Sequence, residues 1–145
     1  MKKQMCIAML LALASGSAFA EWATVGTNEI STLFADLDSM RKTGNVVKMS
    51  YLIDYNKRQV HVNGKRYLST KTHAEYDCAK NEWRQISYAW YAGKMGNGMT
   101  VLGDADEPNA GSAQWHAVPP NSGSEVLWKF ACVTEPSVVD FSKKR

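Results

Sequence analysis

The chain has 145 residues, of which 45% are hydrophobic and 21% are charged, and its formal net charge is +3. This length corresponds to one ordinary domain, and the small net charge excludes the strongly basic composition that is typical of nucleic-acid-binding proteins. No apolar stretch approaches the length of a membrane-spanning helix, so the sequence predicts neither a nucleic-acid partner nor a transmembrane segment.

The first twenty residues have the features of a secretory signal peptide. Lys2 and Lys3 precede an apolar run, and Ala18-Phe19-Ala20 is the pattern of small residues after which signal peptidase cuts. We expect residues 1–20 to be cleaved, which leaves 15 basic and 14 acidic residues in the mature chain. Because the residue directly after the expected cleavage site is Glu21 and not a cysteine, the sequence predicts an exported protein, periplasmic or at the cell surface, that is not a lipoprotein.

The cysteines predict one disulfide. Cys6 lies in the expected signal peptide, so export leaves only Cys78 and Cys132 in an oxidising compartment. Two cysteines allow a single intramolecular pair, and we therefore expect a Cys78–Cys132 bond.

Hydrophobic alternation predicts an antiparallel meander of about six strands. Residues 46 to 55 carry the clearest period of two, and Asn63-Gly64 is a strong hairpin signal. A turn is expected at residues 41 to 45 and an acidic loop at residues 103 to 111. The expected strands are residues 30 to 37, 46 to 55, 59 to 62, 67 to 78, 83 to 92, 99 to 102 and 114 to 118.

One helix is expected to close an α+β domain. Ser122-Gly-Ser-Glu125 is a capping-box sequence, and the residues from Val126 to Cys132 are apolar around most of the helix circumference. Glu125 and Lys129 lie at ion-pair spacing. A helix of this kind must be buried, so we expect it to cross one face of the sheet and to bring Cys132 to Cys78.

The expected disulfide also orients the strand that carries Cys78. Because side chains alternate along a strand, the residues in phase with Cys78 should face the helix. These residues are Leu68, Thr70, Thr72, Ala74 and Tyr76. The residues expected to face away from the helix are Lys65, Tyr67, Ser69, Lys71 and His73.

Catalytic and metal-binding patterns are missing from the sequence. The three histidines have no metal-ligand spacing, and the two mature cysteines are assigned to the disulfide. Asp104-Ala-Asp106-Glu107 resembles the start of a calcium loop, but the twelfth position is Trp115 instead of Glu. No nucleophile–base motif is present. The sequence therefore predicts neither an enzyme, nor a metal site, nor a cofactor.

Two groups of residues are candidate binding surfaces. A basic run interleaved with Tyr55 and Tyr67 is either the solvated face of an edge hairpin or a docking patch for acidic protein segments or sulfated glycans. The basic run comprises Lys57, Arg58, His61, Lys65, Arg66 and Lys71. The aromatic group Trp83, Tyr88, Trp90 and Tyr91 is expected to be mostly core, with one sheet face covered by the helix and the other free to receive a second subunit.

Several short motifs follow one another between Trp22 and Cys132, and together they indicate a family. They are Arg41-Lys-Thr-Gly-Asn45-Val-Val-Lys-Met49, Asp54-Tyr55, Lys65-Arg66-Tyr67, Tyr76-Asp-Cys78, Tyr91-Ala-Gly93, Met95-Gly96, Trp115-x-x-Val118-Pro119 and Glu125-x-Leu127-Trp128. In this order and with paired cysteines, they resemble the surface-adhesin protein E family of Gram-negative bacteria.

The resemblance implies a fold and a function. It implies a six-stranded antiparallel sheet with a C-terminal helix tied to its concave face, within an adhesin E-like domain at residues 21–134 and before a flexible tail at residues 135–145. It also implies adhesion to host extracellular-matrix or serum proteins, and a homodimer as a further property. The contact residues that it implies are Lys65, Arg66, Tyr67, Lys71 and Lys80.

The sequence also supports a second hypothesis, because it departs from an adhesin lipoprotein in two respects. Glu75 and Asp77 add negative charge to the implied binding segment, and the signal peptide has no lipid-attachment cysteine. The alternative is a periplasmic structural or accessory protein of the cell envelope. Such a protein would act through dimerisation or docking of an envelope partner and would have no host ligand.

Overall fold

A computed structural model of the chain describes residues 21–105 and 113–133. The expected signal peptide, most of the expected acidic loop and the expected C-terminal tail lie outside the described residues. All structural statements below refer to the described part of the chain.

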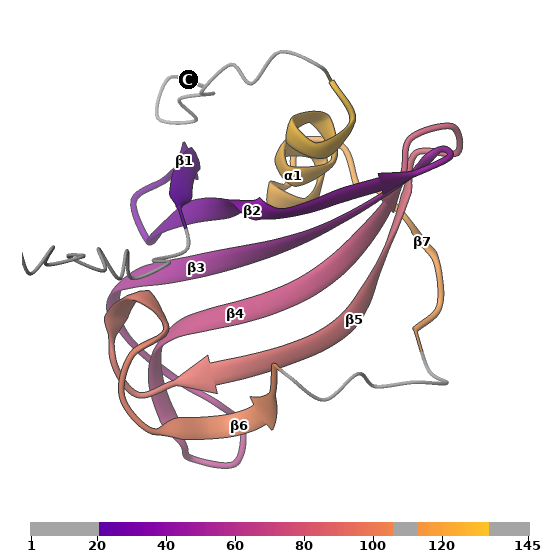
Figure 1. Cartoon of the computed structure of the whole chain (residues 1–145). Helices are drawn as coiled ribbons and strands as arrows, with labels where there is room; N and C mark the ends of the chain where they lie inside the picture. The colour runs from indigo at the N-terminus through magenta and orange to yellow at the C-terminus, as the bar shows by residue number, and fades with distance from the viewer. Residues whose placement is uncertain (1–20, 106–112, 134–145) are drawn as a thin grey trace, which may run out of the picture.

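Six strands follow one another in an antiparallel meander, β1-β2-β3-β4-β5-β6, as the alternation of the sequence predicts (Figure 1). Their bounds are β1 Trp22–Thr27, β2 Ser31–Thr43, β3 Val46–Val60, β4 Arg66–Asp77, β5 Glu82–Tyr91 and β6 Thr100–Asp104. A two-residue strand, β7 (His116–Ala117), pairs with the start of β5, and the short 3-10 helix η1 (Lys94–Gly96) lies between β5 and β6. The helix α1 (Gly123–Cys132) ends the described chain. The predicted α+β fold is confirmed.

The strand boundaries differ from the predicted ones at the N-terminal end. Sequence patterning missed β1, which pairs with the first half of β2. The signal that marks the connecting turn is Asn28, whose side-chain oxygen accepts the N–H groups of Ile30 and Ser31, both at 2.8 Å. β2 extends to Thr43, so the turn predicted at residues 41 to 45 is present but confined to Gly44 and Asn45, with φ of +59° at Gly44.

β3 is one strand where the sequence predicts two. Its pairing with β4 is regular from Val46 to Asp54 and resumes at Gln59, so that residues 55 to 58 stand opposite the single residue Leu68. A bulge of this kind interrupts the alternation without ending the strand, and the polar residues between the two predicted strands belong to it.

The helix begins where the capping box predicts. The hydroxyl of Ser122 accepts the N–H of Glu125 at 3.2 Å. The Glu125 carboxylate accepts the N–H of Asn121 at 2.8 Å, one residue before the cap. The predicted ion pair between Lys129 and Glu125 is present at 2.8 Å. These local contacts satisfy amides that have no partner inside the helix and fix its first turn.

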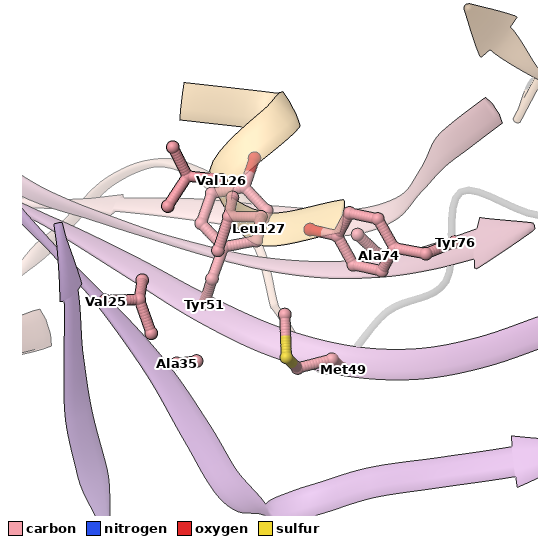
Figure 2. Close-up of a cluster of buried hydrophobic side chains, with 8 residues drawn as sticks. All are labelled: Val25, Ala35, Met49, Tyr51, Ala74, Tyr76, Val126 and Leu127. Carbon is pink, nitrogen blue, oxygen red and sulfur yellow. The ribbon is translucent and has the colours of Figure 1, made fainter. Parts of the chain in front are cut away.

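The core lies between α1 and one face of the sheet. Val126 and Leu127 of the helix pack over buried residues of four strands, Val25, Ala35, Met49, Tyr51, Ala74 and Tyr76 (Figure 2). The predicted disulfide between Cys78 and Cys132 joins the helix to the end of β4, with Cα atoms 5.4 Å apart. The indole N–H of Trp128 donates to the carbonyl of Asp77 at 3.0 Å, so the helix is attached at this end by a hydrogen bond as well.

Part of the other face of the sheet is covered by the chain itself. The Ser69 hydroxyl donates to the carbonyl of Gly93 at 2.6 Å and accepts the N–H of Gly96 at 2.8 Å. The Asp54 carboxylate accepts the N–H of Met95 at 2.7 Å. Residues 93 to 98 therefore lie over this face, where the sequence left room for a second subunit. The sequence predicts that the four aromatic residues of β5 are mostly core, but in the structure all four are only half-buried.

One buried hydroxyl gives the first testable prediction. Tyr76 is fully buried, its hydroxyl has no hydrogen-bond partner within the described residues, and burial raises its pKa well above the usual value. Because an unsatisfied buried hydroxyl costs about 1–3 kcal/mol, we expect Tyr76→Phe to raise the free energy of unfolding by about 1 kcal/mol. Urea denaturation measures the difference. The control is Tyr51→Phe, which removes a hydroxyl bonded to Thr72 and should lower the free energy instead. A loss of stability in Tyr76→Phe would contradict the prediction.

Candidate functional site

The hairpin between β3 and β4 carries the first residues of the implied binding segment. The predicted Asn63-Gly64 turn is present, with φ of +81° at Gly64, a backbone conformation that favours glycine. The N–H of His61 donates to the carbonyl of Lys65 at 2.8 Å, and the N–H of Gly64 donates to the carbonyl of His61 at the same distance. These bonds hold the two strand ends together and bring Lys65 and Arg66 beside the end of β3.

Four rings gather beside this hairpin. The ring centroid of Tyr67 lies 4.4 Å from that of Trp90 and 5.6 Å from that of Tyr55. The imidazole of His61 meets the Trp90 ring edge-on at 4.9 Å. All four side chains are half-buried. Burial raises the pKa of Tyr55, and the neighbouring tyrosines Tyr67 and Tyr51 raise it further. The rings form a continuous aromatic surface that is still partly open to solvent.

The prediction that Tyr67 faces away from the helix is wrong. Register places Tyr55 and Trp90 on the helix side of the sheet, because they are in phase with Ile53 and opposite Thr70, respectively. The Tyr67 ring contacts both of them. The physical reason is the irregular pairing opposite Leu68, which breaks the alternation between Tyr67 and the rest of β4. The same register confirms that Lys71 lies on the opposite face, beside Leu52 and Ala89.

The hairpin and the strand ends beside it also carry basic side chains. Lys57, Arg58, Lys65 and Arg66 are exposed. The salt bridges among residues 21–105 and 113–133 join other residues, so no acidic side chain there neutralises these four cations. The ammonium group of Lys65 donates to the carbonyl of Val101 at 2.9 Å and thereby ties the hairpin to β6.

The same end of the sheet also exposes apolar side chains. Val60 is 63% exposed and Val62 is 98% exposed. Figure 1 shows that this hairpin lies beside β6, at the end of the sheet away from α1. We call the combined surface the hairpin patch; it comprises Tyr55, Lys57, Arg58, Val60, His61, Val62, Lys65, Arg66, Tyr67 and Trp90.

The structure brings together only some of the residues that the family resemblance implies. Lys65, Arg66 and Tyr67 all belong to the hairpin patch, where Arg66 is the strand partner of Val60 and Tyr67 is that of Gln59, so these two side chains leave the strand on opposite sides. Lys71 lies on the other face of β4, and Lys80 lies in the β4–β5 turn beside the disulfide, at the far end of the strand. Sequence reasoning did not connect Trp90, Val60 and Val62 with the basic run. The two valines could have been found, because they closely follow the basic pair Lys57-Arg58 in the sequence. The contact of the Trp90 ring with this hairpin depends on strand pairing, which the sequence does not show.

Within the described ranges, no group of three or more His, Cys, Asp or Glu side chains is placed to hold a metal ion. No described helix is both long enough and apolar enough to cross a membrane.

The comparison with known families agrees with the fold. The model of the family described as surface-adhesin protein E matches residues 22–133. No curated protein sequence matches the chain significantly.

Solved structures of protein E from Haemophilus influenzae resemble the chain at low sequence identity. One structure of the protein from a non-typeable strain is 14% identical with a TM-score of 0.56, and the match covers 81% of this chain and 78% of that chain. A second structure, crystal form II, is 15% identical with a TM-score of 0.53, and the match covers 69% of this chain and 79% of that chain. At these identities the likeness concerns the fold.

Because the family model spans most of the sequence, including both disulfide cysteines, the chain belongs to the surface-adhesin protein E family.

Proposed function

We propose that the chain is an exported, non-enzymatic binding protein that attaches to host extracellular-matrix or serum proteins through the hairpin patch. The observation that carries this proposal is the coincidence of half-buried rings, unneutralised cations and exposed valines on one hairpin. Aromatic residues and arginine are enriched in protein–protein interfaces and supply most of their binding energy. Membership of the adhesin family supports a protein ligand, in preference to a small substrate.

The charge of the patch favours an acidic segment of the partner. Arg58 and Arg66 offer guanidinium groups that suit bidentate contacts with carboxylates, and the rings offer apolar area beside them. Surface cations of this kind mainly raise the association rate, and salt screens their effect. The rings, by contrast, contribute contacts that depend little on salt.

We expect Lys65→Ala with Arg66→Ala to weaken binding to matrix or serum proteins by about tenfold and to reduce its dependence on salt. Surface plasmon resonance with immobilised ligand proteins at low and moderate salt measures both quantities. Lys42→Ala with Lys129→Ala removes the same charge from positions outside the patch and should leave binding unchanged. Equal binding by the wild type and the Lys65/Arg66 variant at both salt concentrations would end the proposal.

Lys71 and Lys80 remain part of the proposed contact set, and they report on the size of the interface. Because they lie on another face and at another end of β4, a partner that touches them together with the hairpin must extend around the sheet. A Lys71→Ala/Lys80→Ala variant distinguishes an extended contact, which it weakens, from one confined to the hairpin.

We propose that export ends at the cell surface, as adhesion to a host protein requires. Protease treatment of intact cells tests this location. Protection from the protease would instead support the second function, an envelope protein of the periplasm that docks a partner or forms a homodimer through its sheet.

A further inference from the structure

The face of the sheet opposite α1 has a pocket of about 400 Å³ framed by two irregularities in the strands. In β2, residues 37 to 40 stand opposite a single residue of β3, because pairing passes from Asp36 directly to Arg41. In β5, Ile86 has no partner, because pairing passes from Gln85 directly to Ser87. Regular alternation would place Ile86 and Ser87 on opposite faces, but the bulge lets both line the pocket.

The β2 bulge is fixed by hydrogen bonds that also position Arg41. The Ser39 hydroxyl donates to the carbonyl of Asp36 at 2.7 Å and accepts the N–H of Ser50 at 2.8 Å. The Nη1 atom of Arg41 donates to the carbonyls of Asp38 and Met40 at 2.8 and 2.7 Å. The guanidinium is therefore held by the bulge, while its Nε and Nη2 groups make no hydrogen bond within the described residues.

A second cation and a histidine complete the polar wall. Lys48 is the strand partner of Arg41 and is exposed, and it forms no salt bridge with the described acidic groups. Its other strand neighbour, Glu75, accepts a hydrogen bond from Nε of Arg84 at 2.7 Å, so that carboxylate is already neutralised. The Nδ1 atom of His73 is hydrogen-bonded to the hydroxyl of Ser50, which is 1% exposed and lies in the floor.

We infer that this pocket binds the phosphate or sulfate ester group of a ligand about the size of a monosaccharide. A fixed guanidinium beside an ammonium group is the donor set that recognises tetrahedral oxyanions. The volume falls within the range of small-molecule sites, and Ile86 and Ala105 offer apolar contact to the body of the ligand. The other carboxylate beside the pocket in register, Asp36, is opposite Ser50; it is nearly buried, and one of its oxygens accepts the N–H of Asp38 at 3.1 Å. The hairpin patch takes no part in this site.

Amide NMR spectra of the oxidised protein test the inference. Three probes are titrated in turn: a hexose monophosphate, the corresponding hexose monosulfate and the unmodified hexose. We expect one or both esters to shift signals around Ser50, His73 and Ile86, and the unmodified hexose to shift none. The difference between the two esters shows which oxyanion the pocket prefers.

Matched variants locate the binding. We expect Arg41→Gln to weaken ester binding by about tenfold, as loss of a charged hydrogen bond does. Lys42→Gln removes the same charge from the next residue of β2, on the helix side, and should leave affinity unchanged. Lys48→Gln tests the site without touching the bulge and should also weaken binding. Absence of ester-induced shifts, or equal losses in Arg41→Gln and Lys42→Gln, would overturn the inference, while the adhesion experiment would be unaffected.

Discussion

Replacement of Cys78 and Cys132 together by alanine is expected to lower the free energy of unfolding by about 4 kcal/mol. The bond closes a segment with a sequence separation of 54, and the unfolded chain gains the entropy of that segment once the bond is removed. A domain of this size is typically stable by about 5–15 kcal/mol, so the variant should be close to the limit of folding. Urea denaturation of the oxidised wild type and the variant measures the loss.

Two controls separate the bond from the side chains. The reduced wild type should unfold at nearly the same urea concentration as the double variant, because both lack the bond. The native oxidised protein should resist alkylation at both positions, whereas Cys132→Ala alone should expose a reactive thiol at Cys78. Unchanged stability of the double variant would show that the helix is held by packing alone.

The sequence predicts the helix well because its determinants are local. Ser122, Glu125 and Lys129 interact across one turn, so their spacing is enough to specify the cap and the ion pair. The cysteine pairing is predictable for a different reason, since Cys6 lies in the expected signal peptide and only two other cysteines are left to pair. The alternation of Met49 and its neighbours likewise predicts a strand with one buried face.

The bulges were not predictable because they depend on strand partners. Nothing in the sequence around Leu68 indicates that four residues of β3 stand opposite it, and this pairing brings Tyr67 to the rings of Tyr55 and Trp90. The bulge at Ile86 is equally invisible in the sequence, although it shapes the pocket on the other face. Both candidate sites therefore depend on long-range register, which a single sequence specifies weakly.

Leu127→Ala is expected to lower the free energy of unfolding by about 3 kcal/mol, within the range for a buried leucine. Leu127 is 4% exposed and packs against the sheet together with Val126 (Figure 2). Lys129→Ala, two residues further along the helix, removes only an exposed ion pair and should cost a few tenths of a kcal/mol. Chemical denaturation compares the two variants, and equal losses would contradict a packed helix–sheet interface.

The combination of Leu127→Ala with the cysteine-free background shows how packing and the disulfide cooperate. Both hold the same helix against the same strands, so the sum of their losses shows whether the bond acts on the unfolded chain or on the packed helix. If the bond mainly restricts the unfolded chain, the two losses sum to about 7 kcal/mol, and we expect the triple variant to be unfolded in the absence of denaturant. If the helix already detaches once the bond is absent, Leu127→Ala adds little, and amide exchange in the cysteine-free protein should be fast in α1 but slow in β3 and β4. We expect the first result, because the indole of Trp128 and the side chains of Val126 and Leu127 attach the helix without the bond.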